Sequence, residues 1–285
     1  MIPRRTFLRA AAATAAGAVL LQGRRGSKLK IGVTDWNLHQ TGKVEAVPLA
    51  KSLGFDGVQV SLGTKPVDGK LPMDNPELID RYLSEAKSNG IALSSTCLDI
   101  LHVNYLKNDK LGEKWVSDGI RITKALKTTV MLLPFFGKGA LNTPEEMDHV
   151  GDVLKELGPE AEKAGVILGL ENTISAANNL RIMERAQSKA VRVYYDVGNS
   201  THGGFDIVRE IRDLGKKNIC EIHLKDNPNY LGEGKIDFSA VLHAINDIDY
   251  QGWVVLETDT PSKSVEADMR RNLAYLRRLI TDGKV

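Results

Sequence analysis

The chain has 285 residues, of which 26% are charged and 42% hydrophobic, the composition of an ordinary globular protein. This length suits one large domain or two small ones. The formal net charge of +2 depends on the first 26 residues, which hold five arginines and no acid. Residues 27–285 therefore carry a net charge of −3, which argues against a nucleic-acid binder with a basic surface.

The first 26 residues differ from the rest of the chain. Arg4 and Arg5 precede a run of small, mildly apolar residues at 10–21, which is the arrangement of a secretory signal. The run is too short to span a membrane, so we expect no stable membrane anchor. With Phe7 and Leu8, the arginine pair resembles the twin-arginine motif, which implies the Tat export machinery as a partner and a periplasmic or exported location. The alternative is a basic tail without a targeting role.

From residue 28 onward, short apolar runs that are typical of buried parallel strands alternate with helical patterns. Each run is rich in β-branched or aliphatic residues and is followed by a turn signal. The predicted strands are Lys30–Thr34, Gly57–Ser61, Ala92–Thr96, Thr129–Leu133, Val166–Glu171, Val191–Asp196, Ile219–His223 and Trp253–Glu257. Eight strand–helix units predict an α/β protein with a single (β/α)₈ TIM barrel domain over residues 27–285.

A doubly wound parallel sheet is the alternative architecture. Such a sheet usually carries a glycine-rich phosphate loop after its first strand, and Asp35, Trp36 and Asn37 do not form one. The sequence also contains no linker or low-complexity segment that would separate a second domain. We therefore prefer the barrel.

Helix ends can be predicted at several places in the chain. The clearest helix covers residues 144–164, with Thr143 as its N-cap and Pro144 at its first position. Four glycines stand just before predicted strands, where helices often end on a residue of left-handed conformation. They are Gly54, Gly90, Gly165 and Gly252.

Cys97 and Cys220 are the only cysteines. They lie far apart in the chain, inside or directly beside predicted strands. We predict two buried free thiols rather than a disulfide.

The last four predicted strands each end in a residue that can bind a metal ion: Glu171, Asp196, His223 and Glu257. In a barrel, the C-terminal ends of the strands meet at one mouth, so these side chains are expected to converge. An unpaired carboxylate behind a buried strand is costly, which makes a cation the natural partner. Three carboxylates and one imidazole favour one divalent ion, with Mn²⁺ preferred and Mg²⁺, Co²⁺ or Zn²⁺ as alternatives.

These residues stand in motifs that resemble the xylose-isomerase-like TIM barrel superfamily, which includes sugar phosphate isomerases and epimerases. The resemblance covers about residues 28–281. Its motifs are Gly54-Phe55-Asp56-Gly57, Gly169-Leu170-Glu171-Asn172, Asp196-Val197-Gly198-Asn199, His223-Leu224-Lys225-Asp226, Gly232-Glu233-Gly234-Lys235-Ile236-Asp237 and Glu257. It implies that the four strand-end residues hold one divalent ion and that Glu171 and Glu257 also move the proton. The implied activity is that of an isomerase or epimerase acting next to a sugar carbonyl through an enediolate.

Several reactions share this chemistry. Two carboxylates on opposite faces of a carbon can remove and return a proton and so invert it, whereas one carboxylate acting on adjacent carbons isomerises. The alternative is a metal-dependent lyase or dehydratase that acts on oxidised sugars, 3-keto-glycosides or inososes, because proton abstraction can be followed by β-elimination. A non-catalytic sugar-binding barrel is a remote alternative, and the presence of both Glu171 and Glu257 argues against it.

The resemblance extends to an endonuclease of abasic DNA, related to AP endonuclease family 2, that uses three zinc ions. That enzyme needs a His three residues after the strand-six Asp, and this chain has Asn199 there. It also needs His ligands from earlier strands, and the fourth predicted strand ends in Leu133-Pro134-Phe135-Phe136, with no His. We therefore expect no nucleic-acid partner.

Six residues near the predicted mouth are expected to contact a small sugar or keto-sugar substrate. They are Trp36, His102, Asn172, Asn199, His202 and Lys225. Structural interpretations stay open for some of them, such as packing at the barrel rim for Trp36 or loop capping for His202. The identity of the sugar is not determined, and a homo-oligomer is left open.

Overall fold

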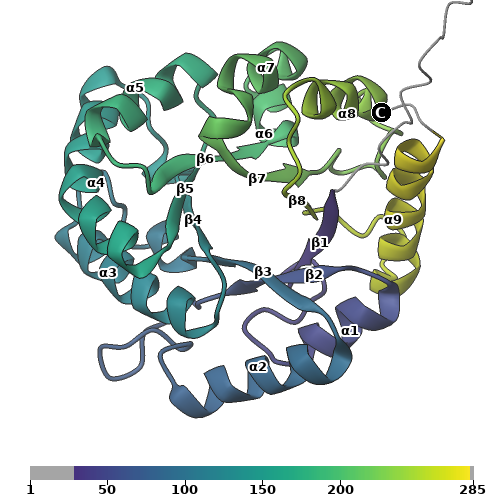
Figure 1. Ribbon diagram of the computed structural model, residues 1–285, viewed down its shortest axis with the longest axis horizontal. Helices are drawn as coiled ribbons and strands as arrows, with labels where there is room; N and C mark the ends of the chain where they lie inside the picture. Colours follow the sequence, from purple (N-terminus) through teal and green to yellow (C-terminus); the bar gives the residue numbers. More distant parts are fainter. Residues whose placement is uncertain (1–28, 283–285) are drawn as a thin grey trace, which may run out of the picture.

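The computed structural model describes residues 29–282, which form a closed barrel of eight parallel strands (Figure 1). The strands pair in chain order, and β8 pairs with β1 to close the barrel. They are β1 (Lys30–Thr34), β2 (Gly57–Ser61), β3 (Ala92–Cys97), β4 (Val130–Pro134), β5 (Ile167–Glu171), β6 (Val191–Asp196), β7 (Ile219–Leu224) and β8 (Trp253–Leu256). The predicted TIM barrel is confirmed, and each strand end differs from the prediction by no more than one residue. Residues 1–26, the predicted export signal, lie outside the described residues.

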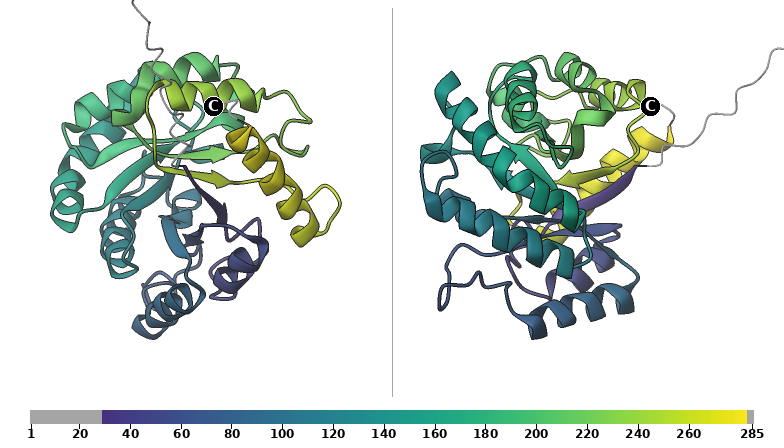
Figure 2. Two further views of the ribbon diagram at one scale, coloured as in Figure 1. Left: turned by 45° about the vertical axis from the view of Figure 1, so that its right-hand side comes forward. Right: turned by 60° about the vertical axis from the view of Figure 1, so that its left-hand side comes forward.

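The helices surround the barrel on the outside (Figure 2). They are α1 (Ala46–Leu53), α2 (Pro76–Asn89), α3 (Lys110–Ala125), α4 (Pro144–Ala164), α5 (Ala176–Ala186), α6 (Val197–His202), α7 (Ile207–Asn218), α8 (Phe238–Asp247) and α9 (Val265–Thr281), with the short 3₁₀ helices η1 (Asp99–His102) and η2 (Gly137–Gly139). Within residues 29–282, no helix is long and apolar enough to cross a membrane.

The start of α4 shows how local sequence determines where a helix begins. The Thr143 side chain accepts a hydrogen bond from the backbone N–H of Glu146, and the Glu146 carboxylate accepts one from the N–H of Thr143. This capping box and Pro144 start α4 where the sequence predicts.

The prediction for Gly252 is wrong. The left-handed residue after α8 is Asp249 (φ 53°), and Gly252 instead makes room for the hydroxyl of Tyr250, with which a Cβ would collide.

The other three glycines, Gly54, Gly90 and Gly165, adopt φ angles of 99°, 58° and 73° and end α1, α2 and α4 as predicted.

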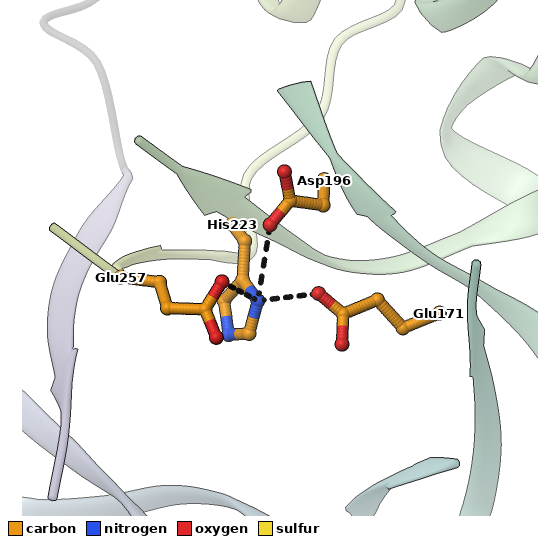
Figure 3. A group of neighbouring side chains, drawn as sticks. All are labelled: Glu171, Asp196, His223 and Glu257. Atoms are coloured by element: carbon orange, nitrogen blue, oxygen red, sulfur yellow. Dashed lines mark hydrogen bonds and ion pairs between the residues drawn. The ribbon is translucent and has the colours of Figure 1, made fainter. Parts of the chain in front are cut away.

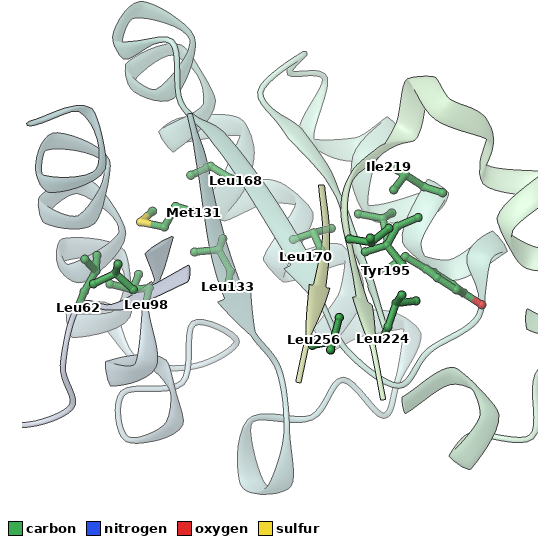
Figure 4. Packing of buried hydrophobic residues seen from close by; sticks show 14 of the residues in the cluster. Leu62, Leu98, Met131, Leu133, Leu168, Leu170, Tyr195, Ile219, Leu224 and Leu256 are labelled. Carbon is green, nitrogen blue, oxygen red and sulfur yellow. The ribbon is translucent and has the colours of Figure 1, made fainter. Parts of the chain in front are cut away.

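The main hydrophobic core lies between the strands and the helices, where strand residues such as Met131, Leu133 and Leu168 are buried (Figure 4). A smaller cluster contains Cys97, Val130, Leu132 and Tyr194. Both cysteines are free, as predicted; Cys97 is buried as expected, whereas Cys220 is only partly buried.

Candidate metal centre

The four metal-capable residues meet at the C-terminal mouth of the barrel. Glu171 and Asp196 are the last residues of β5 and β6, His223 is the penultimate residue of β7, and Glu257 directly follows β8. One ligand atom from each of the four lies within 4.8 Å of the others. Figure 3 shows the three carboxylates turned toward one nitrogen of the His223 ring. We call these residues the four-residue cluster, and their convergence follows from closure of the barrel.

The imidazole of His223 stands at the centre of the four-residue cluster. Its Nδ1 lies 2.9 Å from Glu171 Oε1 and 3.5 Å from both Asp196 Oδ2 and Glu257 Oε2. The ring is fully buried, while the side chain of Glu257 keeps 18% of its exposure. Of these two side chains, only that of Glu257 is therefore in contact with solvent.

The two carboxylate oxygens of Asp196 differ in their hydrogen bonding. Its Oδ1 accepts a hydrogen bond of 2.7 Å from the backbone N–H of Asn199 and so caps α6. Its Oδ2 is buried and accepts no hydrogen bond of good geometry from residues 29–282, although Lys225 Nζ lies 3.0 Å away. An incompletely satisfied buried carboxylate oxygen is costly. A cation at the meeting point of the cluster would satisfy it.

Lys225 reaches the same point from the loop after β7. Its Nζ lies 2.5 Å from Glu257 Oε2, besides its contact with Asp196. Burial alone would lower the pKa of Lys225, but the three nearby carboxylates raise it above its usual value. In the metal-free protein Lys225 is therefore positively charged beside the cluster at neutral pH.

The local electrostatics shift the pKa of each buried member of the four-residue cluster. Burial raises the pKa of Glu171, and the neighbouring carboxylates add to this, although His223 opposes it. Burial would also raise the pKa of Asp196, but Lys225 and His223 together hold it below its usual value. Burial would lower the pKa of His223, yet the surrounding carboxylates raise it to about 10. Without a metal ion the imidazole is therefore protonated at neutral pH.

The donor set fits one divalent ion. Three carboxylates and one imidazole nitrogen, all converging and mostly buried, are ligands that divalent cations accept. The incompletely satisfied oxygen of Asp196 points to the same conclusion. The cluster is consistent with a divalent metal site, and the identity of the metal stays open.

A cavity of about 310 Å³ opens beside the four-residue cluster. It is lined by Trp36, Cys97, Asp99, His102, Pro134, Phe136, Glu171, Asn199, Lys225 and Glu257. Four of the six residues predicted to contact substrate, Trp36, His102, Asn199 and Lys225, thus border it. Trp36 Nε1 donates to Glu257 Oε1 at 3.1 Å, and Asn199 Nδ2 donates to Glu171 Oε1 at 3.4 Å. Both side chains therefore hold a carboxylate of the cluster in place.

The other two predicted substrate contacts lie elsewhere. The amide of Asn172 pairs with the amide of Asn179, and its Oδ1 also accepts from the N–H of Ile174. Asn172 is not among the residues that line the cavity and instead shapes the loop between β5 and α5. His202 is exposed and lines an adjoining cavity of about 480 Å³, which shares Asn199 and Lys225 with the first.

Asp99 is a cavity residue that the sequence interpretation missed. It follows β3, and its Oδ2 accepts a hydrogen bond of 2.7 Å from the hydroxyl of Ser61. Burial raises the pKa of Asp99, while the hydrogen bond from Ser61 opposes the shift. Its place three residues after the predicted strand Ala92–Thr96 was the available signal, because loops that follow barrel strands form the mouth.

Comparisons with known proteins agree with this geometry. Residues 47–279 match the family described as xylose isomerase-like TIM barrel. The chain is 26% identical over 200 residues to 2-epi-5-epi-valiolone 7-phosphate 2-epimerase of Actinoplanes sp., covering 70% of this chain and 73% of the relative. It is 24% identical over 281 residues to 3-dehydro-D-guloside 4-epimerase of Escherichia coli, covering 87% of this chain and 99% of the relative. Other curated relatives, with shorter matches, are inosose dehydratases.

Solved structures show the same fold. The D-psicose 3-epimerase of Clostridium cellulolyticum superposes with a TM-score of 0.74 at 18% sequence identity, covering 88% of this chain and 99% of that chain. At this identity the likeness shows the fold alone. Because the family match extends over most of the described barrel, the chain belongs to the xylose isomerase-like TIM barrel family, among relatives that are sugar epimerases and inosose dehydratases.

Proposed function

We propose that this protein is a divalent-metal-dependent sugar isomerase or epimerase that moves a proton on the carbon next to a carbonyl. The observation that carries the proposal is the convergence of three carboxylates and one imidazole beside a cavity large enough for a sugar. The family membership and the names of the epimerase relatives support it. A divalent ion held there would polarise the carbonyl and stabilise the negative charge that develops on its oxygen.

In this proposal, Glu171 and Glu257 move the proton. Glu171 ends β5 and Glu257 directly follows β8; β6 and β7 lie between these two strands, so the carboxylates approach the cavity from different sides. Burial raises the pKa of Glu171 in the metal-free protein, and a glutamate carboxylate can act as a general base. Trp36, which donates to Glu257, keeps that carboxylate oriented. A proton removed by one carboxylate and returned by the other would invert the carbon.

Exchange with heavy water tests the proposal. The full chain, loaded in turn with Mn²⁺, Mg²⁺, Co²⁺ and Zn²⁺, is incubated in D₂O with free ketoses, inososes and 3-keto-glycosides. We expect NMR to show deuterium at the carbon next to the carbonyl of at least one sugar, together with an epimer or isomer of it. Absence of exchange with every sugar and every ion would overturn the proposal.

A second candidate function, elimination from an oxidised sugar, is favoured by Asp99. Asp99 follows β3 and lines the same cavity as Glu171 and Glu257, which stand at the ends of β5 and β8. Elimination needs a base at the carbon and an acid at the leaving oxygen. A glutamate takes the proton, the C–H electrons form a double bond, and the C–O bond of the next carbon breaks. The oxygen then leaves as water or an alcohol with a proton from Asp99.

The variant Asp99→Asn separates the two candidates. We expect elimination to fall by about 10²-fold or more, the usual contribution of a general acid, because an amide cannot supply the proton. Deuterium exchange next to the carbonyl should continue, since it needs only the glutamates. Both rates are read from one NMR experiment on an inosose or a 3-keto-glycoside. An unchanged elimination rate, or equal loss of both rates, would contradict this role for Asp99.

We also propose that residues 1–26 direct export by the twin-arginine route. The motif is read by a receptor rather than as bulk charge, so Arg4→Lys combined with Arg5→Lys should keep the precursor in the cytoplasm. Cell fractionation and immunoblotting in a bacterial host with this machinery measure the result. Arg24→Lys combined with Arg25→Lys is the matched control, because it changes arginines outside the motif. Equal periplasmic yield of both variants would count against the proposal.

A further inference from the structure

The interior of the barrel directly beneath the four-residue cluster is polar. Gln59 of β2, Ser95 of β3, Tyr194 of β6 and Glu221 of β7 are each at most 1% exposed. Barrel interiors are usually filled by branched apolar side chains, and burial of polar ones is costly unless they are hydrogen-bonded. These four residues form a connected set, which we call the interior polar layer.

The interior polar layer ends on the ring of His223. Gln59 Oε1 lies 2.7 Å from His223 Nε2, the nitrogen that points away from the carboxylates. The Tyr194 ring packs with its centroid 4.5 Å from that of His223, and its hydroxyl lies 3.3 Å from Gln59 Oε1 and 2.9 Å from Glu221 Oε2. The hydroxyl of Ser95 donates to the same Glu221 oxygen at 2.7 Å.

The orientation of the Gln59 amide determines where His223 carries its hydrogen. An amide oxygen only accepts hydrogen bonds, so His223 Nε2 must donate to Gln59. The amide nitrogen of Gln59 is buried and has no partner among the described residues. Two groups that can donate, His223 Nε2 and Tyr194 Oη, meet at Oε1 and favour this orientation of the amide.

We propose that Gln59 is a positioning residue that keeps a hydrogen on Nε2 of His223, so that Nδ1 is the nitrogen that gives up its proton and binds a divalent cation. The proposal rests on the metal site of the proposed function. A neutral imidazole can carry its hydrogen on either nitrogen, but only Nδ1 faces the three carboxylates. An acceptor behind the ring selects the tautomer that binds metal and fixes the angle of the ring.

Two variants of Gln59 test the inference in the full chain. Gln59→Met keeps the length of the side chain but removes the acceptor, and it should weaken Mn²⁺ binding by about 10–100-fold, the usual effect of losing such a partner. Gln59→Glu keeps an acceptor oxygen and should restore most of the affinity. The control is Ser94→Ala. It removes the hydroxyl of a buried serine, which has no hydrogen-bond partner among residues 29–282. It should leave the Mn²⁺ affinity unchanged, and thermal unfolding checks that each variant is folded.

A second readout does not depend on metal affinity. Nitrogen-15 NMR of the metal-free chain and of the Zn²⁺-loaded chain reports which ring nitrogen of His223 is protonated. We expect a hydrogen-bonded Nε2–H in both forms, with its exchange with solvent accelerated in Gln59→Met. If the native chain binds none of the ions but the hydrogen bond from Nε2–H is observed, the proposed metal site is wrong and the orientation of His223 by Gln59 is still supported. If Gln59→Met binds Mn²⁺ as tightly as the native chain, or Nε2 carries no hydrogen, the inference about Gln59 is overturned.

Discussion

Glu171→Gln and Glu257→Gln are each expected to reduce turnover by at least about 10²-fold, at the lower end of what a general base supplies. Glutamine keeps the size of the side chain and one oxygen that can bind metal, but it cannot accept a proton. Metal should therefore be lost to a smaller extent than in a variant that lacks His223. Initial rates and elemental analysis on the same preparations measure both quantities.

The two glutamate variants should also differ from each other. If one carboxylate removes the proton and the other serves the opposite face, deuterium exchange in D₂O should survive in one variant and vanish in the other. Glu210→Gln is the matched control, because Glu210 is a buried glutamate that bonds to Ala176 N–H and Tyr195 Oη outside the cavity. Near-normal turnover in both Glu171→Gln and Glu257→Gln would mean that these glutamates only hold the metal.

His223→Ala is expected to remove most of the bound ion and all activity, and Asp196→Ala should do the same. His223 supplies the only nitrogen of the four-residue cluster, and Asp196 contributes the buried oxygen that lacks a good hydrogen bond. Removing either leaves an incomplete ligand set around buried carboxylates. Elemental analysis after dialysis measures the loss. Full metal occupancy in the double variant would exclude the cluster as the metal site.

Metal binding by the native chain should depend on pH. The surrounding carboxylates raise the pKa of His223 to about 10, so in the metal-free protein the imidazole carries an extra proton at neutral pH. Metal must displace that proton from Nδ1. Apparent affinity should therefore rise as the pH increases from about 6 to 9, with release of protons. Calorimetry in buffers of different ionisation enthalpy counts them, and binding without proton release would contradict the assignment of Nδ1.

Local sequence determined the strands and most of the helix ends of this protein. Buried parallel strands are continuous apolar runs that stop at turn residues, so their limits could be read almost residue by residue, as for Lys30–Thr34 and Val191–Asp196. The four-residue cluster was predictable for a related reason. Once the chain forms a closed barrel, the C-terminal ends of all its strands share one mouth, and the identities of Glu171, Asp196, His223 and Glu257 then specify a metal-capable group.

Only the tertiary structure decided which side chains stand behind and beside that cluster. Gln59 and His223 are 164 residues apart, and their contact depends on the stagger of β2 against β7, which no local pattern encodes. The same holds for Asp99, whose carboxylate accepts a hydrogen bond from Ser61 of the neighbouring strand β2. Asn172 follows a metal-capable residue, yet its amide pairs with Asn179 one turn into α5. Sequence periodicity specifies the face on which a residue lies, whereas the partner it meets across a barrel is set by closure and register of the whole sheet.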